Sequence, residues 1–301
     1  MRSRMRLIDQ LSIVIVTWNG DELLKNCLDS VRRVYGDVPE IVVVDNANQS
    51  SCAKLSQAYR NVKYVAAPEN LGFAGGNNLA LPHVTRDYIL LLNNDTIVHE
   101  DSFTPLLDFL AAHPRVGIVQ GTMNIPARNN GLDVCGEDLW PWGILHHRLV
   151  GQPTATTPLK AKKVFAAKGA MLMMKRQVLA DVGGRFFDPA FKNYFEDIDL
   201  CFRARNAGWE TWFVPTPPID HLCGQTAGKF KHEDIWAQYF RNILVSYHRN
   251  FGFWGHVFTI PCFICAALFR APKALFKALQ SLRQQPATTT SVDQGTGQPT
   301  P

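Results

Sequence analysis

The sequence predicts an α/β fold in which a mostly parallel central sheet is flanked by helices. Short apolar runs alternate with amphipathic segments through the first half of the chain. The runs are apolar at nearly every position, which is typical of parallel strands that helices cover on both faces. With 301 residues, 46% of them hydrophobic, the chain can also bury a large core.

Five strands are predicted in the first half of the chain. They cover Ser12–Thr17, Glu40–Asp45, Val62–Ala66, Tyr88–Asn93 and Val116–Gln120. Between the first two runs, Asp21 can cap a helix whose apolar residues share one face, and Gly36 lies just beyond its end. This segment is therefore a βαβ unit.

The pattern becomes irregular after Gln120 and resumes after about Pro158. The region between is rich in Asn, Gly, Trp and Pro, which favours loops and irregular sheet around a second substrate. Regular elements are then predicted at Ala170–Lys175 (strand), Arg176–Val182 (short helix), Glu196–Ala207 (helix ended by Gly208) and Trp209–Val214 (strand).

The C-terminal part has a different composition. From Phe251 to Phe269, nineteen residues carry no formal charge when histidine is neutral, but Gly252, Gly255 and Pro261 weaken a spanning helix. Four basic residues follow without an intervening acid: Arg270, Lys273, Lys277 and Arg283. We therefore expect a helical appendage that contacts an anionic membrane at its interface; a buried pair of core helices is the alternative.

These patterns divide the chain into three parts. Residues 1–250 are predicted to form the main domain, residues 251–285 the membrane-proximal segment, and residues 286–301, rich in Thr, Gln and Ser, a disordered tail. The basic N-terminus lacks an apolar signal core, so a cytoplasmic protein, peripheral on the inner face of the cytoplasmic membrane, is expected.

Composition excludes several classes of protein. The net charge of +5 is modest and forms no long basic stripe, so a nucleic acid partner is not expected. Seven scattered cysteines indicate a reduced protein and not a disulfide framework. Cys262 and Cys265 have metal-ligand spacing but lack a second pair, so thiols facing lipid or core are expected there.

Polar residues follow directly after the fourth predicted strand, as Asn93, Asn94 and Asp95. Parallel α/β sheets bind ligands at the carboxyl ends of their strands, and a carboxylate there suits a divalent cation that also binds nucleotide phosphates. Asp95 is thus the predicted chief metal ligand. A turn that caps the next helix is the alternative.

The first two strands also end in polar groups. Asp45 can accept the imide N–H of uracil or thymine, and Thr17 and Asn19 can bind base or ribose; turn-forming residues are the alternative. The first loop lacks the GxGxxG pattern, which disfavours a dinucleotide oxidoreductase.

A glycine-rich stretch, Asn70–Asn78, opens a predicted helix. Its glycines, Gly72 and Gly75 among them, can let the backbone approach a ligand closely, and a helix N-terminus favours the negative charge of a diphosphate.

A second acidic cluster begins a helix after an aromatic stretch. The helix dipole is expected to keep Glu196 and Asp197 ionised; Asp197 is the candidate general base and Glu196 an orienting group, with N-terminal capping as the alternative. Asp199 and Arg203 are four residues apart and predict a structural ion pair. His221 is predicted to complete the metal shell or touch the diphosphate; a structural histidine is the alternative.

In this order, the motifs resemble those of the inverting family 2 glycosyltransferases of GT-A fold, most closely the bacterial rhamnosyltransferase-like branch. The resemblance covers roughly residues 10–250 and rests on Ile13–Gly20, Val43–Asn46, Asn70–Asn78, Leu91–Thr96, Gly169–Leu172, Tyr194–Arg203 and His221. The resemblance implies a Rossmann-like sheet. It also implies that Asp95 binds Mg²⁺ or Mn²⁺, that Asp45 binds a pyrimidine, and that Asp197 is the catalytic base.

The resemblance also assigns Asn77 and Asn93 to the nucleotide-sugar donor, and Gly169 and Ala170 to the acceptor. Two departures stand out. Asn93 occupies the position of the first acid in the family's metal-binding motif, and Gly183–Pro189 is longer than the family's usual stretch. Metal affinity is then expected to depend on Asp95, His221 and the diphosphate itself.

The predicted reaction is a direct displacement that inverts the anomeric carbon. The resemblance favours dTDP-rhamnose as donor and a lipid-linked or cell-surface glycan as acceptor. UDP-hexose, UDP-N-acetylhexosamine and UDP-galactofuranose stay open, as does a non-catalytic module that binds nucleotide sugars or glycans. A nucleotidyltransferase is disfavoured, because the first strand is not followed by a basic glycine-rich loop.

Overall fold

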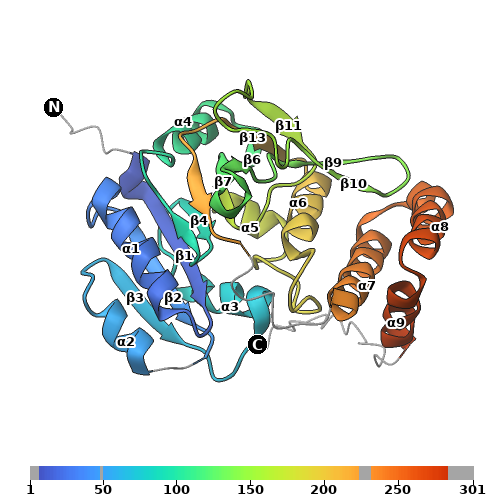
Figure 1. The fold of residues 1–301 in the computed structure, drawn as a ribbon, viewed down its shortest axis with the longest axis horizontal. Coiled ribbons are helices and arrows are strands. Elements are labelled where there is room, and N and C mark those ends of the chain that lie inside the picture. The colour runs from blue at the N-terminus through green and yellow to red at the C-terminus, as the bar shows by residue number, and fades with distance from the viewer. Residues whose placement is uncertain (1–6, 48–49, 224–231, 284–301) are drawn as a thin grey trace, which may run out of the picture.

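A mixed eight-stranded sheet forms the centre of the computed structural model, which describes residues 7–47, 50–223 and 232–283 (Figure 1). From one edge to the other the strands are β11 (Lys162–Val164), β13 (Glu210–Phe213), β6 (Val116–Gln120), β12 (Met171–Lys175), β4 (Tyr88–Leu92), β1 (Leu11–Thr17), β2 (Glu40–Asp45) and β3 (Val62–Ala66). Strands β4, β1, β2 and β3 are parallel, whereas β12 is antiparallel to both of its neighbours.

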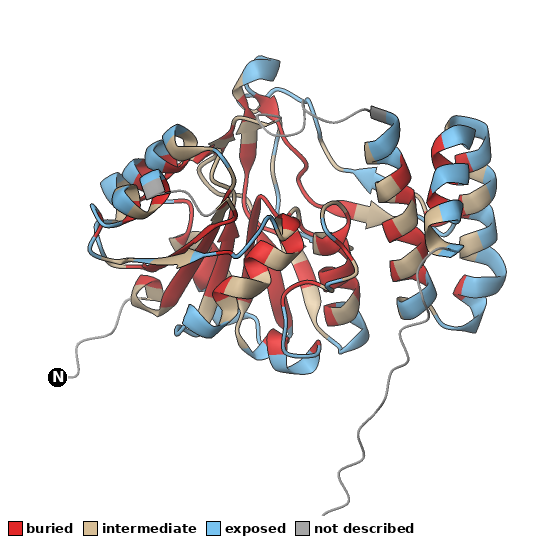
Figure 2. Cartoon of the chain, turned by 90° about the horizontal axis from the view of Figure 1, so that it is seen from below, coloured by how far each residue is buried: buried red, intermediate tan, exposed pale blue. Residues whose placement is uncertain are grey.

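Helices cover both faces of the sheet, as predicted. On one face lie α1 (Asp21–Tyr35), α2 (Ser50–Ser56) and α4 (Thr104–Ala112), and on the other α3 (Gly72–Ala80), α5 (Gln177–Asp181) and α6 (Glu196–Asn206). Successive residues of β1 face opposite ways: Ile13 packs in the first layer and Val14 in the second. Each face is therefore a separate apolar core, visible as buried residues in Figure 2.

Two small sheets lie beside the main one. The first consists of β5 (Thr96–Ile97), β14 (Ile219–His221), β7 (Met123–Ile125) and β8 (Gly131–Leu132), and the second of β9 (Glu137–Leu139) and β10 (Leu145–His147). Short 3₁₀ turns lie at Leu7–Gln10, Leu81–His83 and Pro126–Arg128. Most of these short strands fall in the region for which the sequence predicted loops and irregular sheet.

The end of the predicted main domain is the helix α7 (His232–Asn250). The appendage predicted for residues 251–285 is helical, as expected: it contains a π-helical turn η5 (Gly255–Thr259), α8 (Ile260–Arg270) and α9 (Pro272–Arg283). Phe263 of α8 and Leu275 of α9 belong to the same apolar cluster as α6 and α7, so these helices pack on the domain. None of the helices in the described ranges is long and apolar enough to cross a membrane. The predicted disordered tail lies outside the described residues.

Candidate active site

The carboxyl ends of β1, β2 and β4 meet at one edge of the sheet. Thr17 and Asp45 are partners in the parallel register of β1 and β2, and the Asn94 amide donates a hydrogen bond to Thr17 Oγ1 at 2.9 Å. Asp45 accepts hydrogen bonds from the hydroxyl of Tyr64 and from the N–H of Ala47, both at 3.0 Å. Asn19 lies just beyond β1, with a positive φ of 52°. The predicted donor residues Thr17, Asn19 and Asp45 therefore gather at this edge.

The glycine-rich stretch is built differently from the expectation. The N–H groups of Leu71 and Gly72 bind the side chains of Asn46 and Asn70, and those of Phe73 and Ala74 bind residues 193 and 192. The beginning of α3 thus already has partners within the chain, which removes the reason for placing a diphosphate on these N–H groups.

The glycines of this stretch instead permit close packing. A Cβ on Gly72, whose φ is +72°, would lie 2.6 Å from the Lys192 carbonyl oxygen, and one on Gly75 would lie 2.7 Å from Leu71 Cβ. The amide of Asn77 donates to the Phe73 carbonyl within α3. Donor contacts by Gly72, Gly75 and Asn77 therefore stay a prediction from the resemblance.

A chain of polar contacts connects Asp95 to the centre of the site. Asp95 follows β4, and its carbonyl accepts the N–H of Leu222 at 2.9 Å, which sets it beside β14. His221 lies with Nε2 3.5 Å from Asp95 Oδ1 and with Nδ1 2.7 Å from Asp133 Oδ2. Lys168 Nζ donates to both carboxylate oxygens of Asp133 at 2.8 Å. The predicted pair Asp95 and His221 is thus brought together.

The charges in this chain support one another. Burial raises the pKa of Asp133, but hydrogen bonds from His221 and the Lys168 ammonium outweigh it and hold that pKa well below its usual range. Burial opposes charge on His221 as well, yet its contacts with Asp133 and Asp95 raise the pKa of the imidazole to about 11.

Asp95 and His221 fit a divalent cation. The Oδ1 atom of Asp95 is buried and accepts no hydrogen bond from the described residues, and it faces Nε2 of a histidine whose other nitrogen is held by a carboxylate. A histidine oriented in this way by an acid is the usual arrangement of a metal ligand, and a cation bound at Nε2 would take the place of the proton on that nitrogen. An oxygen and an imidazole nitrogen suit Mn²⁺, and Mg²⁺ with its phosphate ligands can use the oxygen.

Asp133, His221 Nδ1 and Cys223 Sγ form a second group of possible ligands, with Sγ 3.1 Å from Nδ1. In this group, however, the charge of Asp133 is already neutralised by Lys168. Asp133 therefore serves better to orient His221 than to bind a cation, and the Nε2 side is the better cation site.

Asp197 lies at the same edge of the sheet. Its Oδ2 accepts the N–H of Gly169 at 2.8 Å, and its Oδ1 accepts the N–H of Ile198 at 2.8 Å. The carbonyl of Ala170 accepts the N–H of Asn93 at 3.0 Å, so the segment that binds Asp197 also binds the end of β4. The predicted acceptor residues Gly169 and Ala170 thus link Asp197 to the Asn93–Asp95 turn.

Burial changes the expected ionisation of the acidic pair. Burial, with the charge of Asp197, raises the pKa of Glu196 well above its ordinary value. Burial, with the charge of Glu137, raises the pKa of Asp197 to about 6. The helix dipole was expected to keep both groups ionised, but for Glu196 the removal of water outweighs the dipole and favours the protonated form. Asp197 is ionised at neutral pH and has a pKa well suited to a general base.

Several residues of the site escaped prediction. Glu137 on β9 is buried, its Oε2 has no partner among the described residues, and His147 Nδ1 on β10 lies 3.2 Å from its Oε1. Asp133, Lys168 and Cys223 complete the set. The apolar neighbours of Asp133, which is flanked by Leu132 and Val134, are a signal of burial that could have indicated it.

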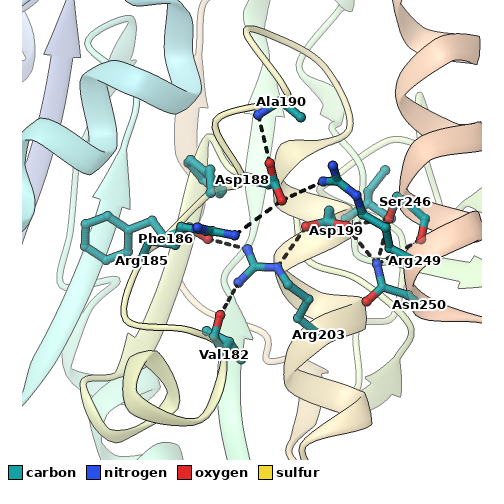
Figure 3. A network of polar contacts seen from close by, with 12 residues as sticks. Val182, Arg185, Phe186, Asp188, Ala190, Asp199, Arg203, Ser246, Arg249 and Asn250 are labelled. Carbon is teal, nitrogen blue, oxygen red and sulfur yellow. Dashed lines mark hydrogen bonds and ion pairs between the residues drawn. The ribbon is translucent and has the colours of Figure 1, made fainter. Parts of the chain in front are cut away.

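A polar network holds α6, the helix that carries the candidate base Asp197 (Figure 3). Asp199 accepts hydrogen bonds from Arg203 at 2.8 Å and from Ser246 at 2.6 Å, which confirms the predicted pair and ties α6 to α7. Asp188 binds Arg249 at 2.7 Å, so the Gly183–Pro189 segment is held to α7 as well. The network gives Asp197 a rigid support.

Sequence comparisons show which proteins the chain is similar to. Residues 9–244 match the family model described as glycosyltransferase like family 2. The chain is 29% identical over 205 residues to the low-salt glycan biosynthesis hexosyltransferase Agl10 of Haloferax volcanii, an alignment that covers 66% of this chain and only 62% of that protein. It is 22% identical over 276 residues to the N-acetylglucosaminyl-diphospho-decaprenol L-rhamnosyltransferase of Mycobacterium tuberculosis, covering 82% of this chain and 87% of the relative.

The fold also matches solved structures. A mannosyltransferase of Pyrobaculum calidifontis in complex with GDP-Man and Mn²⁺ superposes with a TM-score of 0.57 at 17% identity, covering 91% of this chain and 74% of the other. At this identity the likeness concerns the fold, which is the expected GT-A arrangement.

Proposed function

This chain belongs to glycosyltransferase family 2, and we propose that it transfers a sugar, with inversion, from a nucleoside diphosphate to a hydroxyl of a lipid-linked or cell-surface glycan. The observation that carries the proposal is the edge of the sheet shared by Asp197 and the Asp95–His221 pair. Asp197, the proposed base, is connected through Gly169, Ala170 and Asn93 to Asp95 and His221, the residues suited to a cation that binds the diphosphate.

In the proposed reaction, Asp197 Oδ takes the proton of the acceptor hydroxyl while the acceptor oxygen forms a bond to the anomeric carbon. The bond from that carbon to the diphosphate oxygen breaks on the opposite face, and the nucleoside diphosphate leaves with the electron pair. A divalent cation bound by Asp95 and His221 would supply positive charge against the departing diphosphate. The raised pKa of Glu196 favours its protonated form, which could donate a hydrogen bond to the acceptor or to Asp197.

The donor residues are proposed as predicted. Asp45 would bind the pyrimidine, with Thr17 and Asn19 beside it, and Asn77 and Asn93 would contact the donor. dTDP-rhamnose is our preferred donor, supported by the rhamnosyltransferase relative, and a UDP-sugar is the alternative. The cation would be Mg²⁺ or Mn²⁺. We further propose that the protein is peripheral on the inner face of the cytoplasmic membrane.

Transfer to a defined acceptor tests the proposal. The protein is incubated with N-acetylglucosaminyl-diphospho-polyprenol and either dTDP-rhamnose or one of a panel of UDP-sugars, with Mg²⁺, with Mn²⁺ or with chelator. We expect one donor to yield a new glycoside, only when a cation is present, whose anomeric configuration by NMR is opposite to that of the donor. A product that keeps the donor's anomeric configuration would contradict the mechanism. A protein that binds the donor but neither transfers its sugar nor hydrolyses it would favour the non-catalytic module.

A further inference from the structure

The helix α8 and the turn before it expose an apolar stripe. Trp254, Phe258, Cys262, Cys265 and Phe269 are all exposed and lie three or four residues apart, so they follow one side of the helical segment. Trp254, Phe258 and Phe269 expose 68%, 57% and 91% of their surface, and the rings of the first two are stacked at 5.6 Å. We call these five residues the apolar stripe.

The opposite side of the same segment is also apolar. Gly255, Phe263 and Ala267 are buried, and the latter two belong to the apolar cluster that includes α7. When a helix is apolar on all sides, the side that faces away from its own domain also needs an apolar partner. Because α8 is too short to span a bilayer, such a partner contacts only the exposed side of the helix.

The charge beside the stripe is positive. Residues 251–283 contain four basic residues and no Asp or Glu. Arg270 ends α8, and Lys273 is exposed on α9, whereas Lys277 is paired with Asp234 of α7. An apolar helix face with a basic border fits an anionic lipid surface better than it fits a second copy, since two copies would bring their basic borders together.

A hairpin from another part of the chain extends the stripe. The tip of the β9–β10 hairpin contacts the π-helical turn and α7: the hydroxyl of Thr259 donates to the Pro141 carbonyl at 3.3 Å, and that of Tyr247 to the Gly143 carbonyl at 2.9 Å (Figure 1). Trp140 and Trp142, on either side of Pro141, expose 48% and 56% of their surface. Exposed tryptophans are favoured where apolar lipid meets water.

The same hairpin leads to the base. Glu137 on β9 is bonded through its N–H to the Ala166 carbonyl at 2.9 Å, three residues before Gly169, which binds Asp197. The charge of Glu137 acts on Asp197 directly. The hairpin therefore connects the exposed tryptophans at its tip with the surroundings of Asp197.

We propose that the apolar stripe and the Trp140–Trp142 tip form one docking surface for an anionic bilayer, oriented so that the acceptor side of Asp197 faces the membrane. A lipid-linked acceptor would then keep its lipid in the bilayer while its sugar hydroxyl reaches the base. The acceptor part of this inference rests on the proposed function, whereas docking itself does not.

Vesicle flotation of the full chain tests the docking surface. The probes are vesicles of phosphatidylcholine with and without phosphatidylglycerol. Binding should be stronger with phosphatidylglycerol and should weaken about tenfold or more in a Phe258→Ser, Phe269→Ser variant and in Trp142→Ser. The matched control Val150→Ser removes an exposed apolar side chain from the turn that follows β10 and should bind normally.

Charge is tested in the same way. Arg270→Glu with Lys273→Glu should reduce binding to phosphatidylglycerol vesicles, whereas Lys54→Glu with Arg60→Glu, on the α2 side of the domain, should not. Equal binding of all variants, or no binding by the wild type, would overturn the docking surface. So would a concentration-dependent dimer that Phe258→Ser dissociates, because a second copy would then cover the stripe.

Transfer assays separate this inference from the proposed function. The stripe variants should transfer normally to a short, water-soluble acceptor and lose activity only toward a long-chain acceptor in vesicles. Vesicle binding that the variants abolish, in a protein inactive with every donor, would refute the proposed function and leave docking intact. Unchanged activity of the variants toward the vesicle-bound acceptor would refute the orientation.

Discussion

Buried carboxylates lie near both ends of strand β2, and the two ends differ in whether the carboxylate oxygens have hydrogen-bond partners. At its first residue, Glu40 Oε1 accepts hydrogen bonds from Ser12 at 2.6 Å and from the Thr85 N–H at 2.8 Å, and Oε2 accepts from Lys63 at 2.7 Å. Burial raises the pKa of Glu40, but these partners outweigh it and lower the pKa to about 2. This end of the sheet is a satisfied structural site.

The carboxyl edge of the same sheet is left unsatisfied. Among the described residues, Asp95, Glu137 and Glu196 each have a buried carboxylate oxygen without a hydrogen-bond partner. The pKa values of Glu196 and Asp197 rise, where that of Glu40 falls. Buried oxygens without partners are unfavourable unless a ligand completes them, so the contrast between the two ends distinguishes the functional edge from the structural one.

The largest expected effect is that of Asp197→Asn on turnover. Removing a general base should lower kcat by about a hundredfold to ten-thousandfold, while donor binding by calorimetry is unchanged. A variant that keeps most of its turnover would remove Asp197 from the base role.

The same variant should lose a pH dependence of stability. The folded-state pKa of Asp197, about 6, exceeds its ordinary value of 3.8, so the folded protein loses stability as pH rises from about 4 to 6. Asp197→Asn should not show this loss, which amounts to about 1–3 kcal/mol of unfolding free energy in urea titrations at pH 4 and pH 7. The two pH values are compared within each protein, because asparagine has one acceptor oxygen for the two N–H groups that Asp197 binds. A variant that loses as much stability as the wild type between these pH values would contradict the raised pKa.

Glu40→Gln should give the opposite result. It removes charged hydrogen bonds from a buried site and should lower the free energy of unfolding by about 2–4 kcal/mol at pH 7, with kcat retained. The folded-state pKa of Glu40 is depressed, so its contribution is present above about pH 4.5 and is lost as pH falls toward 2. A turnover defect equal to that of Asp197→Asn would erase the distinction between the two ends.

Asp133→Asn tests the orientation of His221. Loss of an acid that holds a metal-binding histidine typically weakens metal binding about 10-fold to 100-fold. Mn²⁺ binding in the absence of donor, followed by electron paramagnetic resonance, should show that loss. Asp138→Asn, which alters an acid on β9 that pairs with Arg148, is the control and should bind Mn²⁺ normally.

Glu137→Gln should have the smallest effect. Without the charge of Glu137 beside Asp197, the pKa of Asp197 should fall, although burial still raises it and Lys168 still lowers it. The acid side of the pH profile of kcat/KM, expected near pH 6, should move to lower pH by a fraction of a unit. A shift to higher pH would contradict the assigned influence of Glu137.

The parallel half of the fold could be predicted because each of its strands is indicated by a pattern within a short stretch of sequence. An all-apolar run such as Glu40–Asp45 specifies a covered strand by itself, and the ends of parallel strands converge, which brings Thr17, Asp45 and Asp95 to one edge. The Asp199–Arg203 pair followed from helical spacing for the same reason.

The rest of the site depends on contacts between distant segments. Asp133 and Lys168 are 35 residues apart, and Asp133 and His221 are 88 apart, so no local pattern specifies their pairing. Burial, which raises the pKa of Glu196, is likewise a property of the packed protein. Gly72 and Gly75 of α3 were assigned to a ligand, but close packing against Lys192 and Leu71 also calls for glycine, and the sequence alone does not separate the two uses.

Anomalous diffraction from crystals grown with Mn²⁺ and a nucleoside diphosphate tests most directly whether the two halves of the edge form one site. We predict a single manganese peak in contact with Asp95 and His221 Nε2, with Asp197 opening onto the same cavity. A peak among Asp133, His221 Nδ1 and Cys223, or an Asp197 that opens onto another surface, would contradict the account.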